Sequence, residues 1–328
     1  MNLHNFVELC MCPAPLGNEY AAKQLIRSML PNGLEISEDV AGSTIVRKPG
    51  EKPGLTFFAS LSQPVVLVTG KKSDGAWELQ PLGTGKTLKP MNGWKVTDGG
   101  GAQAKLEIKD GELRLTEDKG VQIGSLLTRQ PDWTQDALSV SCAGIEDRVG
   151  CWLLTELLRE MPDVKAEITC IFLTQEQHCP KVAELAMNET DAAVAIRLAA
   201  AKVNDTNLTG APVNAGGGPV LKLRERYVST DGRLMDLERM ACREAGVPFQ
   251  YEVLELDATG LYTAQYGHCG VVVGGIDVPA EEGRILLTDL RNTRALVMQL
   301  AANADQIQQA LCSLPAVQHL AQTTKGER

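Results

Sequence analysis

The sequence predicts an α/β fold: a mostly parallel sheet with helices on both faces, interrupted by a small all-β domain. Three observations support this prediction. Strand-like and helix-like segments alternate after residue 137, which is typical of parallel strands joined by crossover helices. Residues 64–136 instead contain short β-like runs between turns and no helical pattern. The chain has 328 residues, 44% of them apolar, which is enough for two domains or for one large domain with an insertion.

The N-terminal part of the chain is predicted to contain one helix and two strands. Residues 18–30 should form the helix, since Asn18 is a favoured N-cap residue and apolar residues follow it at helical spacing. Residues 34–46 and 55–61 are predicted strands. The proline- and glycine-rich segment 49–54 is predicted to form the turn between them.

The middle of the chain has a different texture. Short β-like runs at residues 65–68, 104–108 and 112–115 alternate with glycine-containing turns at residues 98–101 and 109–111. Many short strands between such turns are typical of an all-β unit.

The C-terminal part of the chain returns to alternating helices and strands. Helices are predicted at residues 148–161, 179–187, 234–245 and 286–302, and strands at residues 166–173, 192–199, 249–256 and 270–274. We therefore predict one α/β domain over residues 1–63 and 137–328. The inserted β domain should cover residues 64–136, and oligomerisation is the role we expect for it.

The charge and the cysteine content limit the class of protein. A formal charge of −9 argues against nucleic acid and against an anionic membrane surface as the main partner. No apolar stretch reaches the roughly 18 residues of a membrane helix, and the first residues lack the pattern of a secretion signal. The nine cysteines are scattered through apolar segments, as is typical of reduced thiols. We therefore expect a cytoplasmic protein.

Acidic residues stand where an open α/β sheet commonly binds ligands. Glu146 and Asp147 precede the predicted helix 148–161, and Glu176 follows the predicted strand 166–173. Residues beyond the carboxyl ends of parallel strands line the ligand crevice of such a sheet. Carboxylates there can hold a divalent metal or act as a general base. The alternative is that Glu146 or Asp147 only favours the positive end of the helix, with Glu176 solvated.

Two other segments carry weaker signals. Gly216-Gly217-Gly218-Pro219 lacks the strand–turn–helix setting of a dinucleotide site, so we expect a close backbone approach there before a short strand. His178 and Cys179 are adjacent in sequence, whereas the partners of a catalytic cysteine meet in space.

Several motifs recur in a specific order along the chain. Residues 12–19 are Cys-Pro-Ala-Pro-Leu-Gly-Asn-Glu and residues 39–43 are Asp-Val-Ala-Gly-Ser. Further motifs lie at residues 145–151, 174–177, 216–219 and 246–250. Together they resemble the motifs of the tetrahedral aminopeptidase family, in which the first two are Ala-Pro-Gly-x-Ser-Gly-x-Glu and Asp-x-x-Gly-Asn. This family includes glutamyl and deblocking aminopeptidases, some formerly labelled endoglucanases, and the resemblance spans almost the whole chain.

The resemblance implies a fold, an assembly and a chemistry. The fold is a zinc-peptidase-like α/β domain interrupted by a small β-barrel-like domain. Members of the family usually form dimers and then dodecamers, so a homo-oligomer is expected here. Their chemistry uses two divalent metals, commonly zinc or cobalt, which lower the pKa of a bridging water, with a glutamate as general base.

The family's five metal-ligand positions fall on residues of other types in this chain. Ser60 stands in place of a histidine, Glu146 in place of the bridging aspartate, and Gln177 in place of a glutamate. Arg197 stands in place of an aspartate, and Glu282 aligns best with the last histidine. Only the general-base position is retained, as Glu176.

The resemblance therefore predicts a non-catalytic or strongly altered homologue that holds no metal. A guanidinium cannot donate a lone pair to a metal, but Arg197 can replace the charge of one among Glu146, Glu176 and Glu282. A peptide or small-molecule ligand is compatible with this prediction.

Two alternatives remain open at this point. One is a working aminopeptidase whose carboxylate-rich site, formed by Glu146, Glu176 and Glu282, holds zinc, cobalt or manganese. The other is metal-free hydrolysis that uses Cys179 or His178.

Overall fold

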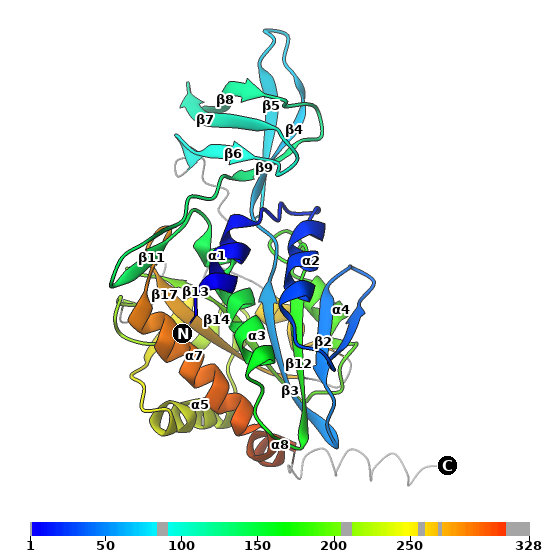
Figure 1. The fold of residues 1–328 in the computed structure, drawn as a ribbon, viewed down its shortest axis with the longest axis vertical. Coiled ribbons are helices and arrows are strands. Elements are labelled where there is room, and N and C mark those ends of the chain that lie inside the picture. Colours follow the sequence, from blue (N-terminus) through cyan, green and yellow to red (C-terminus); the bar gives the residue numbers. More distant parts are fainter. Residues whose placement is uncertain (1, 84–90, 205–211, 255–259, 268–270, 313–328) are drawn as a thin grey trace.

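The protein consists of an α/β body and a smaller β-barrel that projects from one end of it (Figure 1). The computed structural model describes residues 2–83, 91–204, 212–254, 260–267 and 271–312. The chain leaves the body after one of its central strands, forms the barrel, and then returns to complete the body.

The body is built on a nine-stranded sheet in the order β1-β2-β12-β3-β13-β17-β14-β15, with β16 paired to β14. Its strands are β1 (Glu35–Glu38), β2 (Thr44–Lys48), β3 (Lys52–Ser60), β12 (Ala166–Leu173), β13 (Val194–Lys202), β14 (Val220–Glu225), β15 (Val228–Ser229), β16 (Gln250–Leu254) and β17 (Val272–Ala280).

The four central strands, β12, β3, β13 and β17, are parallel, as the sequence predicts. The sheet as a whole is mixed rather than mostly parallel, because β1, β2 and β15 join it through antiparallel pairs and β14 runs antiparallel to β17. The short connections β1–β2 and β14–β15 leave no room for a crossover helix, so they enforce antiparallel pairing.

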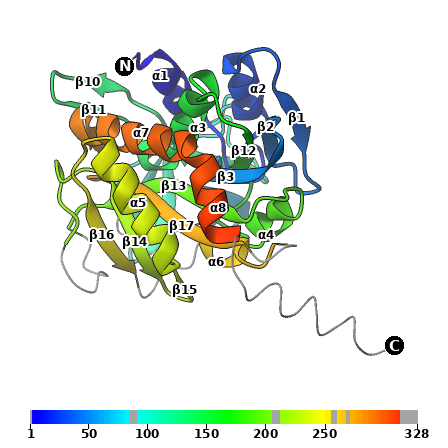
Figure 2. The same ribbon diagram turned by 90° about the horizontal axis from the view of Figure 1, so that it is seen from below.

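Helices cover both faces of this sheet. One face carries α1 (His4–Met11), α2 (Tyr20–Met29), α3 (Val149–Arg159), α5 (Gly232–Glu244), α7 (Leu287–Ala302) and α8 (Ala304–Cys312). The other carries α4 (Val182–Met187) and α6 (Gly260–Ala264), which lie together in Figure 2. The neighbouring residues Phe57 and Phe58 of β3 are both fully buried and point into the two different cores. A strand buried on both faces explains why this segment is a continuous apolar run.

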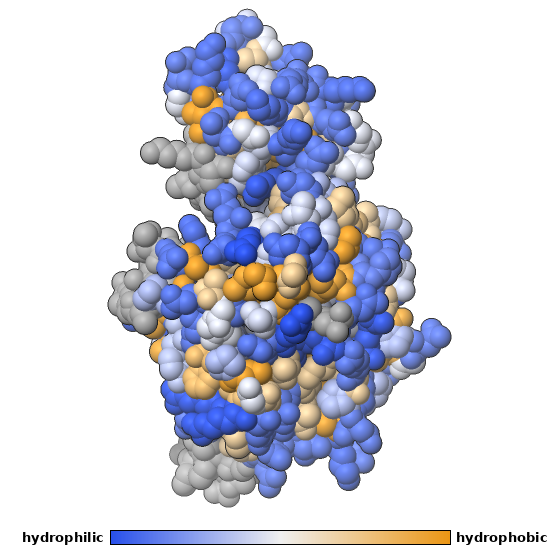
Figure 3. All heavy atoms as spheres, turned by 60° about the vertical axis from the view of Figure 1, so that its left-hand side comes forward, coloured by the Kyte–Doolittle hydropathy of each residue, from blue (hydrophilic) through white to orange (hydrophobic). Residues whose placement is uncertain are grey.

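The barrel has six antiparallel strands in the order β5-β4-β9-β6-β7-β8. They are β4 (Val65–Lys71), β5 (Trp77–Leu82), β6 (Lys95–Thr97), β7 (Gln103–Lys109), β8 (Glu112–Lys119) and β9 (Leu126–Arg129). The sheet is nearly closed by side chains: the Trp77 Nε1–H donates to Asp118 at 2.7 Å, and Lys72 pairs with Glu112 at 2.7 Å. Figure 3 shows the barrel set off by a narrower neck and largely hydrophilic on that face. All six strands lie within residues 64–136, the limits we propose for the inserted domain.

The structure corrects three details of the N-terminal prediction. Residues 34–46 form the hairpin β1–β2 rather than one strand, because the Asp39 carboxylate accepts the backbone N–H groups of Ala41 and Ser43 and holds a turn there. Asn18 is not the N-cap of α2; Glu19 takes that position, without a capping side-chain bond. Helix α1 was not predicted from the sequence. In the part of the chain that is described, no helix is both long enough and apolar enough to cross a membrane.

The core contains one carboxyl group with no evident partner. Glu238 of α5 is fully buried, and neither of its side-chain oxygens has a hydrogen-bond partner among the described residues. It faces Gly274 of β17, where an added Cβ would lie 2.6 Å from Glu238 Oε1. Burial raises the pKa of Glu238 to about 8, and Arg239 only partly opposes this shift.

We predict that Glu238 makes the protein less stable as the pH rises. Its pKa is about 4.3 in an unfolded chain and about 8 in the folded one. Between these pH values the unfolded chain releases the proton while the folded protein keeps it, so the free energy of unfolding falls as the pH rises. Glu238→Met should remove this slope and stabilise the protein above about pH 8 by on the order of 5 kcal/mol, the upper limit set by the difference between the two pKa values. Urea denaturation at a series of pH values, with the exposed Asp236→Asn on the same helix as control, would measure it. Parallel pH profiles for wild type and Glu238→Met would contradict the prediction.

Candidate functional site

The candidate site lies at the carboxyl ends of the central strands, beside the barrel. Its predicted residues come from five places in the chain: Ser60 ends β3, Arg197 lies in β13, Glu176 and Gln177 follow β12, Glu282 follows β17, and Glu146 lies in the short 3₁₀ helix η2 (Ile145–Asp147) ahead of α3. The small sheet of β10 (Thr134–Gln135), β11 (Ser139–Ser141) and β18 (Arg284–Leu286) brings η2 next to the turn that carries Glu282.

A buried arginine fixes the position of η2. Arg148 is fully buried, and its guanidinium donates hydrogen bonds to the carbonyl oxygens of Leu61 and Cys12. Two residues later, Gly150 packs against β13, where an added Cβ would lie 2.2 Å from the carbonyl oxygen of Leu198. The Asp-Arg-Val-Gly string therefore has a structural role: it joins the end of β3, the N-terminal segment and the start of α3.

Glu146 and Asp147 are close together in a mostly buried setting. The Glu146 carboxylate accepts the backbone N–H of Gly283, in the turn that also carries Glu282. Burial raises the pKa of Glu146, while the bond from Gly283 lowers it. Burial, followed by the charge of Glu146, raises the pKa of Asp147 to about 7. These two acidic residues do not simply cap α3 in solvent, since both lie against the body.

Gln177 acts as a hydrogen-bond donor. Its Nε2–H group donates to Asp147 Oδ1 at 2.7 Å and to the carbonyl oxygen of Ser62 at 3.0 Å. A glutamate at this position would place a second negative charge against Asp147, which the amide avoids. The amide thus ties the segment after β12 to η2.

The segment before Glu176 is held by a second polar network. Gln175 has a left-handed backbone with φ of 55°. Its N–H donates to Ser62 Oγ at 2.6 Å and to Glu19 Oε1 at 3.1 Å, and the Ser62 hydroxyl itself donates to Glu19. These bonds stabilise an unfavourable backbone conformation and so fix the position of Glu176.

Arg197 forms an ion pair with Glu176. The distance from Arg197 Nη2 to Glu176 Oε1 is 3.7 Å, longer than a direct hydrogen bond, and Glu176 is only 2% exposed. Burial lowers the pKa of Arg197, but Glu176, Glu225 and Asp277 together outweigh this effect and raise it. Arg197 therefore remains charged beside the general-base position.

A buried lysine, which the sequence analysis missed, lies next to Arg197 on the same face of the sheet. Lys222 Nζ of β14 lies 2.7 Å from Glu252 of β16, 2.9 Å from Asp277 of β17 and 3.3 Å from Glu225. All four side chains are 3% exposed or less. Burial lowers the pKa of Lys222, but the three carboxylates outweigh it and raise the pKa.

The sequence does contain a signal for this cluster. Lys222, Glu252 and Asp277 are each a charged residue with an aliphatic or aromatic residue on either side, where such a residue is rarely buried without a partner. The strand pairing sets Lys222 directly beside Glu252. Sequence alone does not show that these three strands are neighbours.

A small cavity opens at the junction of the barrel and the body. Its volume is about 190 Å³. Barrel residues Trp94 and Arg129 line one side, and Glu146, Asp147 and Glu282 line the other. Glu282, placed only loosely by its motif, thus lies in the same cavity as Glu146.

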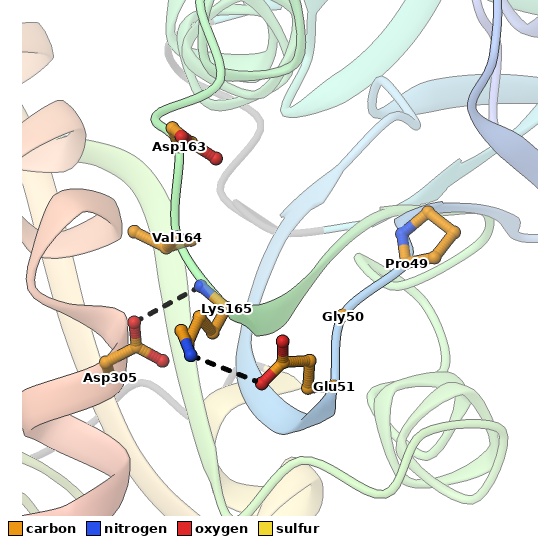
Figure 4. Close-up of a pocket in the computed structure, with 7 residues that line it drawn as sticks. All are labelled: Pro49, Gly50, Glu51, Asp163, Val164, Lys165 and Asp305. Carbon is orange, nitrogen blue, oxygen red and sulfur yellow. Dashed lines mark hydrogen bonds and ion pairs between the residues drawn. The ribbon is translucent and has the colours of Figure 1, made fainter.

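A larger hollow lies at the opposite end of β3, where the strand begins (Figure 4). It is open and shallow. Lys165 bridges it, through its backbone N–H to Asp305 at 3.2 Å and through its ammonium to Glu51 at 3.7 Å. Since a nine-residue strand separates this hollow from Ser60, it belongs to a different part of the protein.

The glycine segment also agrees with its prediction. An added Cβ at Gly217 would lie 2.3 Å from the Gln250 side chain, and one at Gly218 would lie 2.2 Å from the Pro248 carbonyl oxygen. The N–H groups of Gly216 and Gly218 donate to the buried Asp289. The predicted close backbone approach is therefore confirmed.

Comparison with known proteins identifies the family. The family model of M42 glutamyl aminopeptidases matches residues 107–288. The chain belongs to this family. A candidate aminopeptidase of Acetivibrio thermocellus is 23% identical over 282 residues, covering 80% of this chain and 86% of that protein.

Solved structures of TET peptidases share the fold. The TET aminopeptidase of a Thaumarchaeota archaeon from marine sediment superposes with a TM-score of 0.84 at 16% identity, covering 94% of this chain and 99% of the other. The TET1 peptidase of Pyrococcus horikoshii, which can assemble into a tetrahedron or a large octahedral shell, gives a TM-score of 0.78 at 17% identity over 91% and 98% of the two chains. These likenesses show that the chain shares the overall fold of TET peptidases.

The side chains at this M42 site do not fit a pair of divalent metals. Within the described ranges, no three His, Cys, Asp or Glu side chains converge to hold a metal ion. Gln177 already donates to Asp147, and Arg197 brings a positive charge beside Glu176, which opposes binding of a cation there. Ser60 has a buried hydroxyl, with no hydrogen-bond partner in the described part of the chain, that could supply at most one weak oxygen ligand.

The adjacent His178 and Cys179 do not form a catalytic pair in this M42 chain. Both side chains are exposed, and no hydrogen bond joins them. Their backbone N–H groups instead bond to the carbonyl oxygen of Gln175 and close the turn after β12. We therefore assign them no chemistry.

Removing the buried lysine tests the charge balance at the site. Lys222→Met leaves Glu225, Glu252 and Asp277 buried without their ammonium, so we expect a loss of about 3–5 kcal/mol in the free energy of unfolding. Lys105→Met, which breaks only an exposed pair with Glu107, should leave the free energy of unfolding nearly unchanged, because such pairs contribute little. Urea denaturation at neutral pH measures the free energy of unfolding of both variants. If Lys222→Met loses no more than Lys105→Met, the cluster is not essential to stability.

Proposed function

We propose that this chain is a non-catalytic or strongly altered member of the M42 family. In this proposal it keeps the fold, and Arg197 supplies positive charge where relatives hold metals. The ion pair between Arg197 and Glu176 is the observation that carries the proposal. In this proposal Glu176 is paired with a guanidinium and has no metal-activated water to deprotonate.

Lys222 strengthens this proposal. Arg197 and Lys222 together bring two positive charges to a face that carries Glu176, Glu225, Glu252 and Asp277. Buried carboxylates need such compensation, because an unpaired charge in the interior is costly. Arg197 and Lys222 would thus neutralise the carboxylates as a divalent ion does, but they have no Lewis acidity.

The alternative is a working aminopeptidase with a carboxylate-rich metal site. It draws support from the cavity, which Glu146 and Glu282 share. It has to overcome the charge of Arg197 and the absence of a third converging ligand in the described residues.

We further propose that the chain forms a homo-oligomer. Its fold matches that of TET peptidases, one of which assembles into closed shells. The projecting barrel is the part of the molecule that we expect to mediate these contacts.

Metal content separates the two candidate functions. Protein purified without chelator should contain far less than one equivalent of zinc, cobalt or manganese by mass spectrometry. It should also fail to hydrolyse aminoacyl p-nitroanilides when these metals are added. Stoichiometric metal together with turnover would overturn the non-catalytic proposal.

Restoring the family residues tests the role of Arg197 directly. The quintuple variant, which carries Ser60→His, Glu146→Asp, Gln177→Glu, Arg197→Asp and Glu282→His, should bind zinc. The matched quadruple variant, which keeps Arg197, should bind zinc at least about tenfold more weakly. This ratio corresponds to about 1.4 kcal/mol in binding free energy. Calorimetric titration with zinc gives both affinities, and circular dichroism checks that both variants fold. Equal affinities would show that Arg197 is not what excludes the metal.

A further inference from the structure

The cavity between barrel and body has walls of opposite character. It measures about 190 Å³, below the roughly 300–1,000 Å³ of pockets for drug-sized ligands. Its walls come from separate parts of the fold, since Trp94 and Arg129 belong to the barrel and Glu146 and Glu282 to the body. The space therefore suits a compact molecule rather than an extended chain.

The barrel wall supplies one cation. The Arg129 guanidinium lies 5.0 Å from the centre of the Trp94 ring, which orients it by a cation–π contact. Within the described residues, no hydrogen bond or ion pair engages this guanidinium. An arginine of this kind at a cavity wall is suited to binding a carboxylate through two parallel hydrogen bonds.

The wall formed by the body supplies carboxylates. Glu146, Asp147 and Glu282 all line the cavity, and they come from η2 and from the turn after β17. They do not converge on one point as metal ligands do. A spread-out acidic wall can accept the several N–H donors of an ammonium group, which is larger than a metal ion and less demanding in geometry.

We propose that this cavity binds a free α-amino acid, with its carboxylate on Arg129 and its ammonium against Glu146, Asp147 and Glu282. The ligand carries both a negative and a positive charge, which match the two walls, and it is a compact molecule, as the cavity requires. A peptide bound by its N-terminal residue would lack the carboxylate opposite Arg129. This site rests on the proposed function, because Glu146 and Glu282 would hold a metal in the alternative.

Titration calorimetry on the full-length protein tests the proposal with defined probes. L-Alanine, L-leucine and L-glutamate are each titrated, and for the amino acid that binds best the C-terminal amide and the N-acetyl derivative are titrated as well. We expect at least one free amino acid to bind. Blocking either charged group should weaken its binding at least about tenfold, because each loses a charge-assisted contact.

Variants of the two walls complete the experiment. Arg129→Met and Glu282→Gln should each weaken binding several-fold. Arg114→Met, elsewhere on the barrel, and Glu281→Gln, the exposed neighbour of Glu282, should leave it unchanged. Because Glu282 is exposed, its substitution does not threaten folding, so it remains informative if Arg129→Met fails to fold.

The outcomes are distinct. Absence of binding by all three amino acids would overturn the proposal, as would equal affinity for the amide or unchanged binding in Glu282→Gln. None of these results bears on metal content or hydrolysis, which test the proposed function separately.

Discussion

The buried guanidinium of Arg148 is the interaction on which the site depends. It donates to two carbonyl oxygens from different segments: Leu61, just after β3, and Cys12, in the N-terminal region. Arg148 itself is the N-cap residue of α3. Charged donors to buried carbonyls are strong, and without them both oxygens would lose their partners in the interior. Glu146 lies in η2, which directly precedes Arg148, Ser60 directly precedes Leu61, and Gln177 donates to Ser62 and Asp147, so the positions of these three residues depend on this anchor.

Charge compensation is the second constraint. The sheet gathers four carboxylates on one buried face, and such a face is unstable unless cations accompany them. A protein of this fold can meet the need with ions from solution or with side chains of its own. Arg197 and Lys222 meet it from within, which ties the charge balance to folding rather than to the supply of a metal.

The sequence was sufficient for much of the fold, because the strand and helix patterns are local. The central parallel strands and the inserted β region follow from apolar runs and turns, whereas the β1–β2 hairpin depended on the Asp39 side chain bonding its own backbone. At the site, the motifs located Glu146, Glu176 and Gln177. They did not show that Gln177 donates to Asp147, or that Lys222 is surrounded by acids, since both facts arise from contacts between distant segments.

The close contact at Gly150 has a consequence for how such chains evolve. No side chain fits between α3 and β13 at this position, whatever chemistry the neighbouring residues perform. Selection on packing therefore acts on the glycine and on Arg148 independently of any selection on metal binding. In a motif that combines both kinds of residue, the structural half is retained for packing alone, whatever becomes of the chemical half.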